Sequence, residues 1–411
     1  MTERLSGTLA AAAKHLGALV VLGGALALAA PALAGKEPAP KKAETAAEAE
    51  PQGRLRLVVS LTDQKVDVYR GLEVIESSRV STGKAGHSTP AGVYSILQKS
   101  RWHRSNIYSS APMPFMQRIT WSGIALHEGH VPNYPASHGC IRLPGQFARK
   151  LFSMTGLGVD VIVVDRHAAF EPIDDDALFQ PAGPPRVASA APMPRTPDAA
   201  SMEFADFEAQ LEMMRAWESR SPEPLRILVT RRTGRERLMD LQRMLKELGH
   251  DPGEIDGWLG GNTGAAIQSF QESIGAPRTG MVTEELYAQL HEAVGRPEIT
   301  GHLYVRQKHV DLFDAPVAIR DDAAPLGTHV FAVRDFEDTA DEASWAVLTM
   351  TDPDMGSAKA ALDRIDIPES LRRRVAFLLT SGSTFIISDA GLGRETGKGT
   401  DFIVQPGAWT P

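Results

Sequence analysis

The residues best suited to chemistry lie in the stretch Ser137-His138-Gly139-Cys140-Ile141-Arg142, where Cys140 is the only cysteine among 411 residues. A thiol is a nucleophile when it ionises, and nearby cations favour the thiolate. Arg142 follows two residues after Cys140, and His127 and His130 precede it. This pattern predicts a nucleophilic cysteine rather than a thiol buried as a small apolar side chain, the other common environment of a free cysteine.

A nearby imidazole can accept the thiol proton and stabilise the thiolate. His127 follows the apolar run Ile124-Ala125-Leu126, which has the composition of a strand. His130 is the alternative base, but it lies between Gly129 and Val131 in a proline-bearing loop. A base gains most when its position is fixed before the reaction, so we expect His127 to be the base.

The runs from Ile124 to His127 and from Ser137 to Pro144 resemble the signature of the L,D-transpeptidase catalytic domain of bacterial cell walls. Strand-like runs followed by Thr82-Gly83 and by Thr89-Pro90-Ala91-Gly92-Val93-Tyr94 match the front half of that domain. The resemblance implies a mostly β, sandwich-like domain over residues 54–166. The interval from His127 to Ser137 is shorter than is usual in the family, which implies a trimmed loop.

The resemblance also implies a substrate, the peptidoglycan tetrapeptide stem, which is cut before its terminal D-Ala through a thioester on Cys140. Backbone N–H groups around Gly139 would stabilise the oxyanion, because glycine lets the chain turn tightly there. Ser137 and His138 would shape the pocket. The Arg142 guanidinium would bind a stem carboxylate or, alternatively, hold the loop through backbone carbonyls. No cofactor and no metal are expected.

Three other functions compete with this interpretation. A zinc site built from His127, His130, His138 and Cys140 has acceptable ligands but unusual spacing, and it would silence the nucleophile. A peptidoglycan hydrolase would use the same thioester with water as the acceptor, and a non-enzymatic protein would only bind the wall. For a transferase, the acyl acceptor could be another stem, a free D-amino acid or the N-terminus of an outer-membrane protein.

The N-terminal residues predict export. Residues 1–34 contain a basic start, an apolar run and a small-residue cleavage site, which is the pattern of a secretory signal peptide. We therefore expect a periplasmic protein, anchored in the membrane if the signal is not cleaved. Residues 35–53 are rich in Ala, Pro, Glu and Lys and predict a disordered linker. A net charge of −8 with no basic run argues against a nucleic-acid partner.

Residues 167–223 are rich in Pro and Ala and predict a linker, with a short helical pattern at Phe204, Phe207, Leu211 and Met214. Residues 224–297 contain leucines at helical spacing and an Asp256-Gly257 turn, and they resemble the three-helix peptidoglycan-binding domain. That resemblance implies contact with glycan or stem peptide. Trp258 would be either a platform for a sugar or a buried aromatic anchor.

The last region, residues 300–406, contains a degenerate repeat of the catalytic domain. Pro144–Asp165 aligns without a gap on Pro368–Asp389, which places Arg364 at the position of Cys140. Val66–Tyr69 and Val310–Phe313 form a second similar pair. We expect a scaffold without thiol chemistry, in a multidomain α+β protein. The run from Gly393 to Thr400 superficially resembles a phosphate-binding loop, but its spacing is wrong, so we interpret it as a glycine-rich loop.

Overall fold

The computed structural model describes residues 53–105, 110–183, 214–296, 299–321, 324–334, 336, 342–393 and 395–406. The predicted signal segment, all of the first linker except Gly53, and the helical positions Phe204, Phe207 and Leu211 lie outside the described residues. Residues 214–219, which include Met214, are helical. No helix within the described ranges has the length and apolar character needed to cross a membrane.

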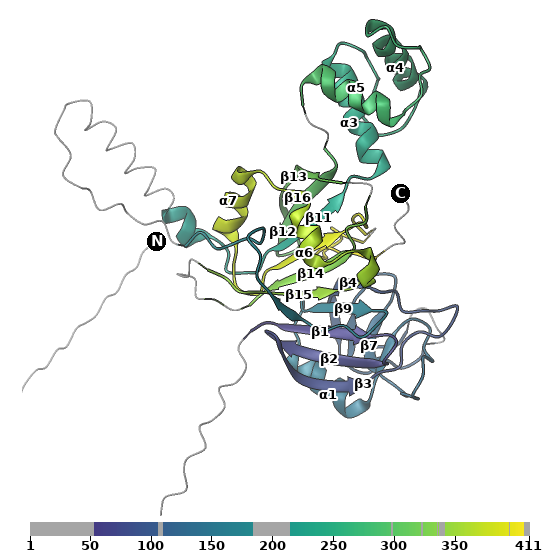
Figure 1. The fold of residues 1–411 in the computed structure, drawn as a ribbon. Helices are drawn as coiled ribbons and strands as arrows, with labels where there is room; N and C mark the ends of the chain where they lie inside the picture. Colours follow the sequence, from purple (N-terminus) through teal and green to yellow (C-terminus); the bar gives the residue numbers. More distant parts are fainter. Residues whose placement is uncertain are drawn as a thin grey trace, which may run out of the picture. The chain divides into compact units, whose positions relative to one another are not determined.

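The predicted catalytic domain, residues 54–166, contains two sheets that share one core (Figure 1). The five-stranded sheet has the order β3 (Glu73–Arg79), β2 (Lys65–Arg70), β1 (Leu55–Ser60), β9 (Asp160–Val164), β4 (Gly92–Ser95). The four-stranded sheet has the order β5 (Gln98–Ser100), β6 (Met116–Arg118), β7 (Ala125–Glu128), β8 (Ile141–Leu143). Leu57 and Val161 pack with Leu126 of the second sheet and with Leu151 of helix α1 (Gly145–Met154). The predicted mixed α+β class is confirmed.

The C-terminal region forms an eight-stranded sheet. Its order is β10 (Glu171–Ile173), β15 (Trp345–Thr349), β14 (Thr328–Val333), β17 (Thr384–Ser388), β11 (Arg226–Arg231), β12 (Gly301–Gln307), β13 (Val310–Ile319), β16 (Ile365–Asp366). Helices α6 (Ala358–Asp363) and α7 (Glu369–Leu378) contribute to its core, and the 3-10 turn η1 (Pro353–Met355) precedes α6. Two segments of this sheet lie upstream of the predicted domain start at residue 300. They are β10, in the predicted linker, and β11.

The helical domain is an insertion within this sheet. Strand β11 pairs antiparallel with β12, with Arg231 opposite Gly301. Helices α3 (Gly234–Glu247), α4 (Gly261–Ser273) and α5 (Glu284–Val294) lie between these strands in sequence and share one core. The expected start of the helical domain at residue 224 is therefore too early. Leucines at helical spacing indicate the helical bundle in the sequence. The apolar run of β11, in contrast, could by sequence alone belong either to the helical domain or to the C-terminal sheet.

The two large sheets have the same strand pattern. β3-β2-β1-β9-β4 corresponds to β13-β12-β11-β17-β14, with β1 parallel to β9 and β11 parallel to β17. This register makes β2 equivalent to β12. The expected match of Val66–Tyr69 with Val310–Phe313 is therefore wrong, because Val310–Phe313 begins β13, the equivalent of β3.

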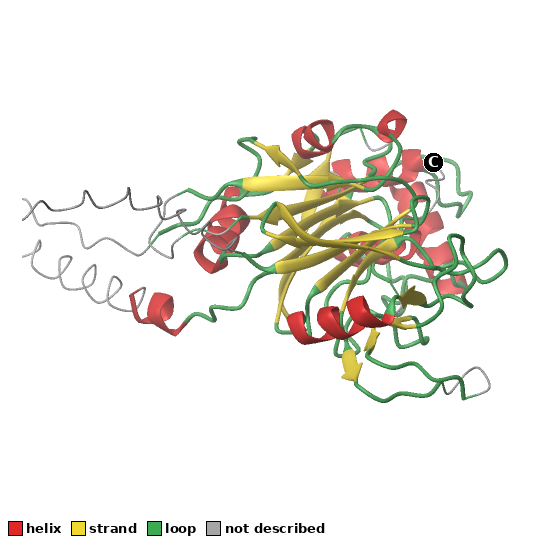
Figure 2. Cartoon of the chain, turned by 90° about the horizontal axis from the view of Figure 1, so that it is seen from below, coloured by secondary structure: helices red, strands yellow, loops and turns green. Residues whose placement is uncertain are grey.

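The two sheets pack against each other through a shared apolar layer. Val58 and Ile162 of the first sheet belong to the same buried cluster as Leu228 and Ile386 of the second. Figure 2 shows these strands in yellow. Both faces of β9 are therefore buried, which explains why its sequence, Asp160–Val164, is apolar after the first residue rather than alternating.

Candidate active site

Strands β7 and β8 bring the predicted nucleophile and base to one face of the four-stranded sheet. They run parallel, and His127 lies opposite Arg142. Cys140 immediately precedes β8. Because successive side chains of a strand alternate between faces, Cys140 shares a face with Arg142 and hence with His127. The sequence prediction that these three residues meet is consistent with this register.

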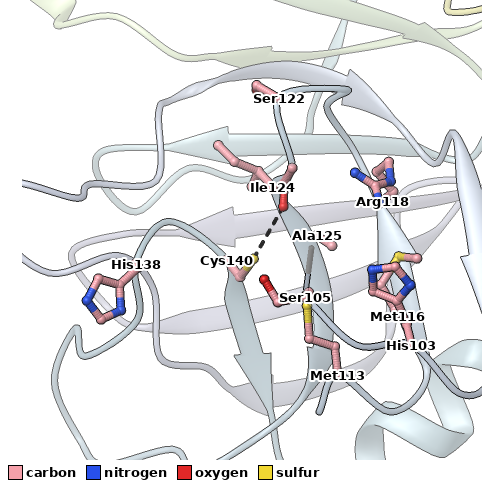
Figure 3. Close-up of a pocket in the computed structure, with 11 residues that line it drawn as sticks. His103, Ser105, Met113, Met116, Arg118, Ser122, Ile124, Ala125, His138 and Cys140 are labelled. Atoms are coloured by element: carbon pink, nitrogen blue, oxygen red, sulfur yellow. Dashed lines mark hydrogen bonds between the residues drawn. The ribbon is translucent and has the colours of Figure 1, made fainter. Parts of the chain in front are cut away.

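The Cys140 side chain lines a pocket of about 110 Å³ (Figure 3). Its Sγ lies 3.6 Å from the carbonyl oxygen of Gly123, in the turn before β7. Met113, Met116 and Ala125 form a small apolar cluster against the thiol. The pocket also includes residues that the sequence did not single out: His103, Ser105, Arg118 and Ser122. The loop and strand residues among them carry no local pattern that signals a pocket.

The resting thiol is less acidic than the sequence suggests. Burial raises the pKa of Cys140 above its ordinary value, although the backbone N–H of Ala125 and the charges of Arg142 and Arg118 act in the opposite direction. Desolvation therefore outweighs the positive neighbours that the sequence revealed. The consequence is a neutral thiol that needs a base at the moment of attack.

His127 is suited to be that base. Its Nδ1 lies 2.7 Å from the carbonyl oxygen of Glu128, and a carbonyl can only accept, so Nδ1 carries the proton and Nε2 is left with a lone pair. Burial lowers the pKa of His127 to about 4, so the ring is neutral at pH 7. His130, the alternative, is exposed. Neither histidine is among the residues that line the pocket.

The residues before Cys140 fix its backbone. The Ser137 hydroxyl donates to the carbonyl of Cys140 at 2.5 Å and accepts from the N–H of Gly139 at 3.1 Å. The Thr89 hydroxyl donates to the carbonyl of Gly139 at 2.7 Å. Gly139 has a φ of +113°, which a side chain would strain. The Gly139 N–H expected to stabilise the oxyanion is therefore already bonded to Ser137 in this state.

His138 is an exposed wall of the pocket. Its ring centroid lies 4.7 Å from that of His87, at an interplanar angle of 59°. Figure 3 shows the His138 ring on the opposite side of Cys140 from His103. This position fits the expectation that His138 shapes the pocket rather than attacks.

Arg142 holds the loop with its backbone and leaves its guanidinium for other partners. Its N–H and carbonyl both pair with Ser81, at 2.9 and 3.0 Å. The aliphatic stem packs against Gly129, where a Cβ would come within 3.1 Å of Arg142 Cγ and Cδ. Within the described ranges, no hydrogen bond or ion pair of the guanidinium is found. The geometry therefore favours carboxylate binding over the alternative in which the guanidinium holds backbone carbonyls.

The described residues contain no group of three or more His, Cys, Asp or Glu side chains that could hold a metal ion. In the C-terminal domain, the position aligned with Cys140 is filled by Arg364. Its guanidinium donates to the backbone carbonyls of Arg320, Asp321, Ala324 and Pro325. An arginine bonded to a loop in this way offers no nucleophile.

In the helical domain, Trp258 is 66% exposed, so it is not a buried aromatic anchor. The guanidinium of Arg235 lies 5.8 Å from the centroid of its ring. An exposed indole with one face partly covered by a cation is compatible with stacking on a sugar.

Two family models match this chain. Residues 54–164 match the L,D-transpeptidase catalytic domain, and residues 234–290 match a putative peptidoglycan binding domain. Both resemblances inferred from the sequence motifs are thereby confirmed. The second match begins with α3, as the structure does, rather than with β11. No curated protein sequence matches the chain.

Several solved structures are similar to part of the chain. An L,D-transpeptidase from Mycobacterium smegmatis is 23% identical over 27% of this chain and 58% of its own, with a TM-score of 0.26. One from Stackebrandtia nassauensis is 28% identical over 30% and 62%, with a TM-score of 0.26. L,D-transpeptidase 1 of Mycobacterium tuberculosis is 28% identical over 27% and 61%, with a TM-score of 0.24. The chain thus covers less than two thirds of the length of each.

Proposed function

We propose that this chain, which carries an L,D-transpeptidase catalytic domain and a peptidoglycan-binding domain, is an exported transpeptidase with Cys140 as its nucleophile. Its substrate is the tetrapeptide stem of peptidoglycan, cut before the terminal D-Ala. The acyl group passes to an amine, which cross-links or modifies the wall. The protein acts in the periplasm, where residues 1–34 direct it.

One observation carries the proposal: Cys140 lines a small pocket and lies on the same sheet face as His127, whose ring is neutral and oriented. Nε2 of His127 accepts the thiol proton while Sγ attacks the carbonyl of the third stem residue. The tetrahedral oxyanion collapses, His127 returns the proton to the leaving amine of D-Ala, and a thioester remains. The amine of the acceptor then attacks the thioester, loses its proton to His127, and regenerates the thiol.

The Arg142 guanidinium, which makes no hydrogen bond or ion pair with the described residues, supports a substrate with a carboxylate near the reacting bond. A guanidinium binds a carboxylate through two parallel hydrogen bonds. The resemblance to the family implies a stem whose third residue is usually diaminopimelate. This residue and D-Ala both carry carboxylates, so Arg142 can select the stem and align its scissile carbonyl with Cys140.

The test is incubation of the purified full chain with a disaccharide-tetrapeptide, followed by mass spectrometry of the products. We expect free D-Ala and a dimer joined between two third residues, with an acyl-enzyme mass on Cys140. The Cys140→Ser variant should give none of these, because a hydroxyl is far harder to ionise than a thiol. Free D-Ala with a tripeptide but no dimer would instead identify a hydrolase. Sacculus binding with no product would identify a wall-binding protein.

A further inference from the structure

The turn that contacts the thiol is hydrogen-bonded at its tip to residues outside the turn. Between β6 and β7, the hydroxyl of Thr120 accepts from the N–H of Ile124 at 2.9 Å, and the carbonyl of Thr120 accepts from the N–H of Gly123 at 3.2 Å. The N–H groups of Trp121 and Ser122, at the tip, point away from these acceptors and bond outside the turn. The carbonyl of Gly123 is the group 3.6 Å from Cys140 Sγ.

Both tip N–H groups bond to one carboxylate from the far end of the chain. Oε2 of Glu395 accepts from Trp121 N–H and Oε1 accepts from Ser122 N–H, each at 2.8 Å. The indole Nε1 of Trp121 donates to the carbonyl of Lys398 at 2.9 Å. Three hydrogen bonds therefore join the active-site turn to the glycine-rich loop from Gly393 to Thr400, whose sequence superficially resembles a phosphate-binding loop.

That loop is itself fixed to the catalytic domain. The Thr400 hydroxyl donates to the carbonyl of Glu395 at 2.7 Å. Val404 and Val93 exchange two backbone hydrogen bonds, of 2.8 and 3.2 Å, and Ile403 is buried in the catalytic core. On the other side of Glu395, the N–H of Gly393 donates to the carbonyl of Ile403 at 2.9 Å. The carboxylate is thus presented by a backbone anchored on both sides, so it can impose a position on the turn instead of following it.

We infer that Glu395 is a positioning residue for the thiol pocket, holding the 120–123 turn so that Gly123 and Ile124 frame Cys140. The reaction that it assists is the one under "Proposed function", on which the inference rests. Figure 3 shows Ile124 beside Cys140, with Ser122 above Ile124 and farther from the thiol. The C-terminal domain then has a defined role, because its residue Glu395 holds a turn that lines the thiol pocket of the other domain.

Glu395→Gln is the sharpest test because each carboxylate oxygen has its own donor. A glutamine offers one oxygen and one NH₂ group, so one of the two N–H groups meets a donor. Glu395→Asp keeps both oxygens on a shorter side chain, so it should preserve part of the positioning of the turn. Trp121→Phe removes only the indole bond to Lys398. Glu369→Gln, at an exposed position of α7 in the same domain, is the matched control.

Two rates are measured at a temperature well below unfolding of every variant. The first is turnover of the disaccharide-tetrapeptide, and the second is alkylation of Cys140 by iodoacetamide as a function of pH. In Glu395→Gln we expect kcat to fall about tenfold or more, since misplacement by about 1 Å can cost two orders of magnitude. Alkylation at neutral pH should become faster, because a loosened pocket admits water and relieves the burial that makes the thiol weakly acidic.

Unfolding would also slow turnover and speed alkylation, so the two rates are compared only in variants that circular dichroism shows to be folded, and the alkylation rate must not change with urea added below the unfolding transition. An unchanged kcat and an unchanged alkylation profile in a folded Glu395→Gln protein would overturn the inference, as would an equal loss in Glu369→Gln. If Glu395→Gln does not fold, Trp121→Phe and Glu395→Asp decide by the same two rates. Alkylation needs no stem peptide, so an altered profile in a protein that gives no product would reject the proposed function and retain the positioning role.

Discussion

The guanidinium groups of Arg56 and Arg226 converge on one carboxylate, that of Asp160, at 3.7 Å and 2.9 Å. The two arginines occupy equivalent positions, because Arg56 pairs with Asp160 in one sheet and Arg226 pairs with Thr384 in the other. Each also donates to a carbonyl of the opposite repeat: Arg56 to Gly382 at 3.2 Å and Arg226 to Gly158 at 3.3 Å. This reciprocal contact is what an approximate two-fold relationship between the sheets produces.

Asp160→Ala should therefore destabilise the protein strongly. The change removes the carboxylate that two buried guanidinium groups share, although Arg226 keeps Asp401 at 3.7 Å as a second carboxylate partner. Removal of one partner from a buried ion pair costs about 3–5 kcal/mol. Urea unfolding followed by circular dichroism measures the free energy of unfolding. Asp354→Ala, at an exposed carboxylate, should change it by less than about 0.5 kcal/mol. A similarly small change in the free energy of unfolding for Asp160→Ala would contradict this prediction and would mean that water solvates the two guanidinium groups in the variant.

Excision of the helical insertion should leave a folded, reactive protein. Arg232 donates its N–H to the carbonyl of Thr300 at 3.0 Å, so the two ends of the insertion are hydrogen-bonded neighbours. Residues 233–299 can be replaced by a two-residue Asn-Gly turn, which suits a hairpin. We expect loss of binding to insoluble sacculi, measured by co-sedimentation, with Cys140 alkylation unchanged.

A longer deletion, of residues 224–297, is the matched comparison. It removes β11, which lies between β12 and β17 in the sheet, so it should abolish folding. If the shorter excision also prevents alkylation, the insertion contributes to the thiol pocket.

Catalytic motifs and domain boundaries differ in how much of them a sequence can reveal, and the reason is physical. Cys140 and His127 lie in short motifs whose residue types are dictated by chemistry. The apolar run of β11, by contrast, says only that a strand is buried, and its partners β12 and β17 are distant in sequence. An insertion within a hairpin therefore leaves no local signal. The acidity of the thiol was also beyond the sequence, because it depends on how deeply Cys140 is buried.

The role of Glu395 could not be predicted either. Its carboxylate accepts from the backbone N–H groups of Trp121 and Ser122. Almost every residue has such a group, so the residue types do not show which of them will bind a carboxylate. From the sequence, the run from Gly393 to Thr400 could be interpreted only as a glycine-rich loop. The repeat was visible through α1 and β9, which align without a gap on α7 and β17, but β2 was matched to the wrong strand because apolar–acidic alternation recurs in many strands.

Arg142→Ala should impair stem binding more than chemistry. The guanidinium makes no hydrogen bond with the described residues, so its loss leaves the loop intact while removing a charged partner for the stem carboxylate. A charge-assisted hydrogen bond contributes about 1.5–3 kcal/mol, which corresponds to a rise in KM of at least about tenfold. Steady-state kinetics on the disaccharide-tetrapeptide measures this, and Arg142→Lys should recover only part of it. An unchanged KM would assign the arginine to structure.

Acid should destabilise the protein partly through His127. Burial lowers its pKa from 6.5 to about 4, so between these values the unfolded chain binds a proton that the folded chain does not. Stability from this group is therefore full above pH 6.5 and is lost as pH falls towards 4. At 1.36 kcal/mol per pH unit the loss is at most about 3 kcal/mol. Urea unfolding at several pH values measures how the free energy of unfolding depends on pH. Between pH 6.5 and 4 this free energy should fall less steeply in His127→Gln than in the unmodified protein. An equally steep fall in both proteins would contradict the buried, neutral state.

The identity of the base can be decided among three histidines. His127 has an oriented, neutral ring on the face of Cys140, His130 is exposed, and His103 lines the pocket. Removing a general base costs about 10²–10⁴ in rate, so His127→Ala should slow acylation of Cys140 by the stem that far, whereas His130→Ala should change it by less than about threefold. His103→Ala should alter KM through the pocket wall but keep the pH profile of kcat. Stopped-flow acylation across pH separates the three, and a larger loss at His103 than at His127 would place the base on the pocket wall instead of on β7.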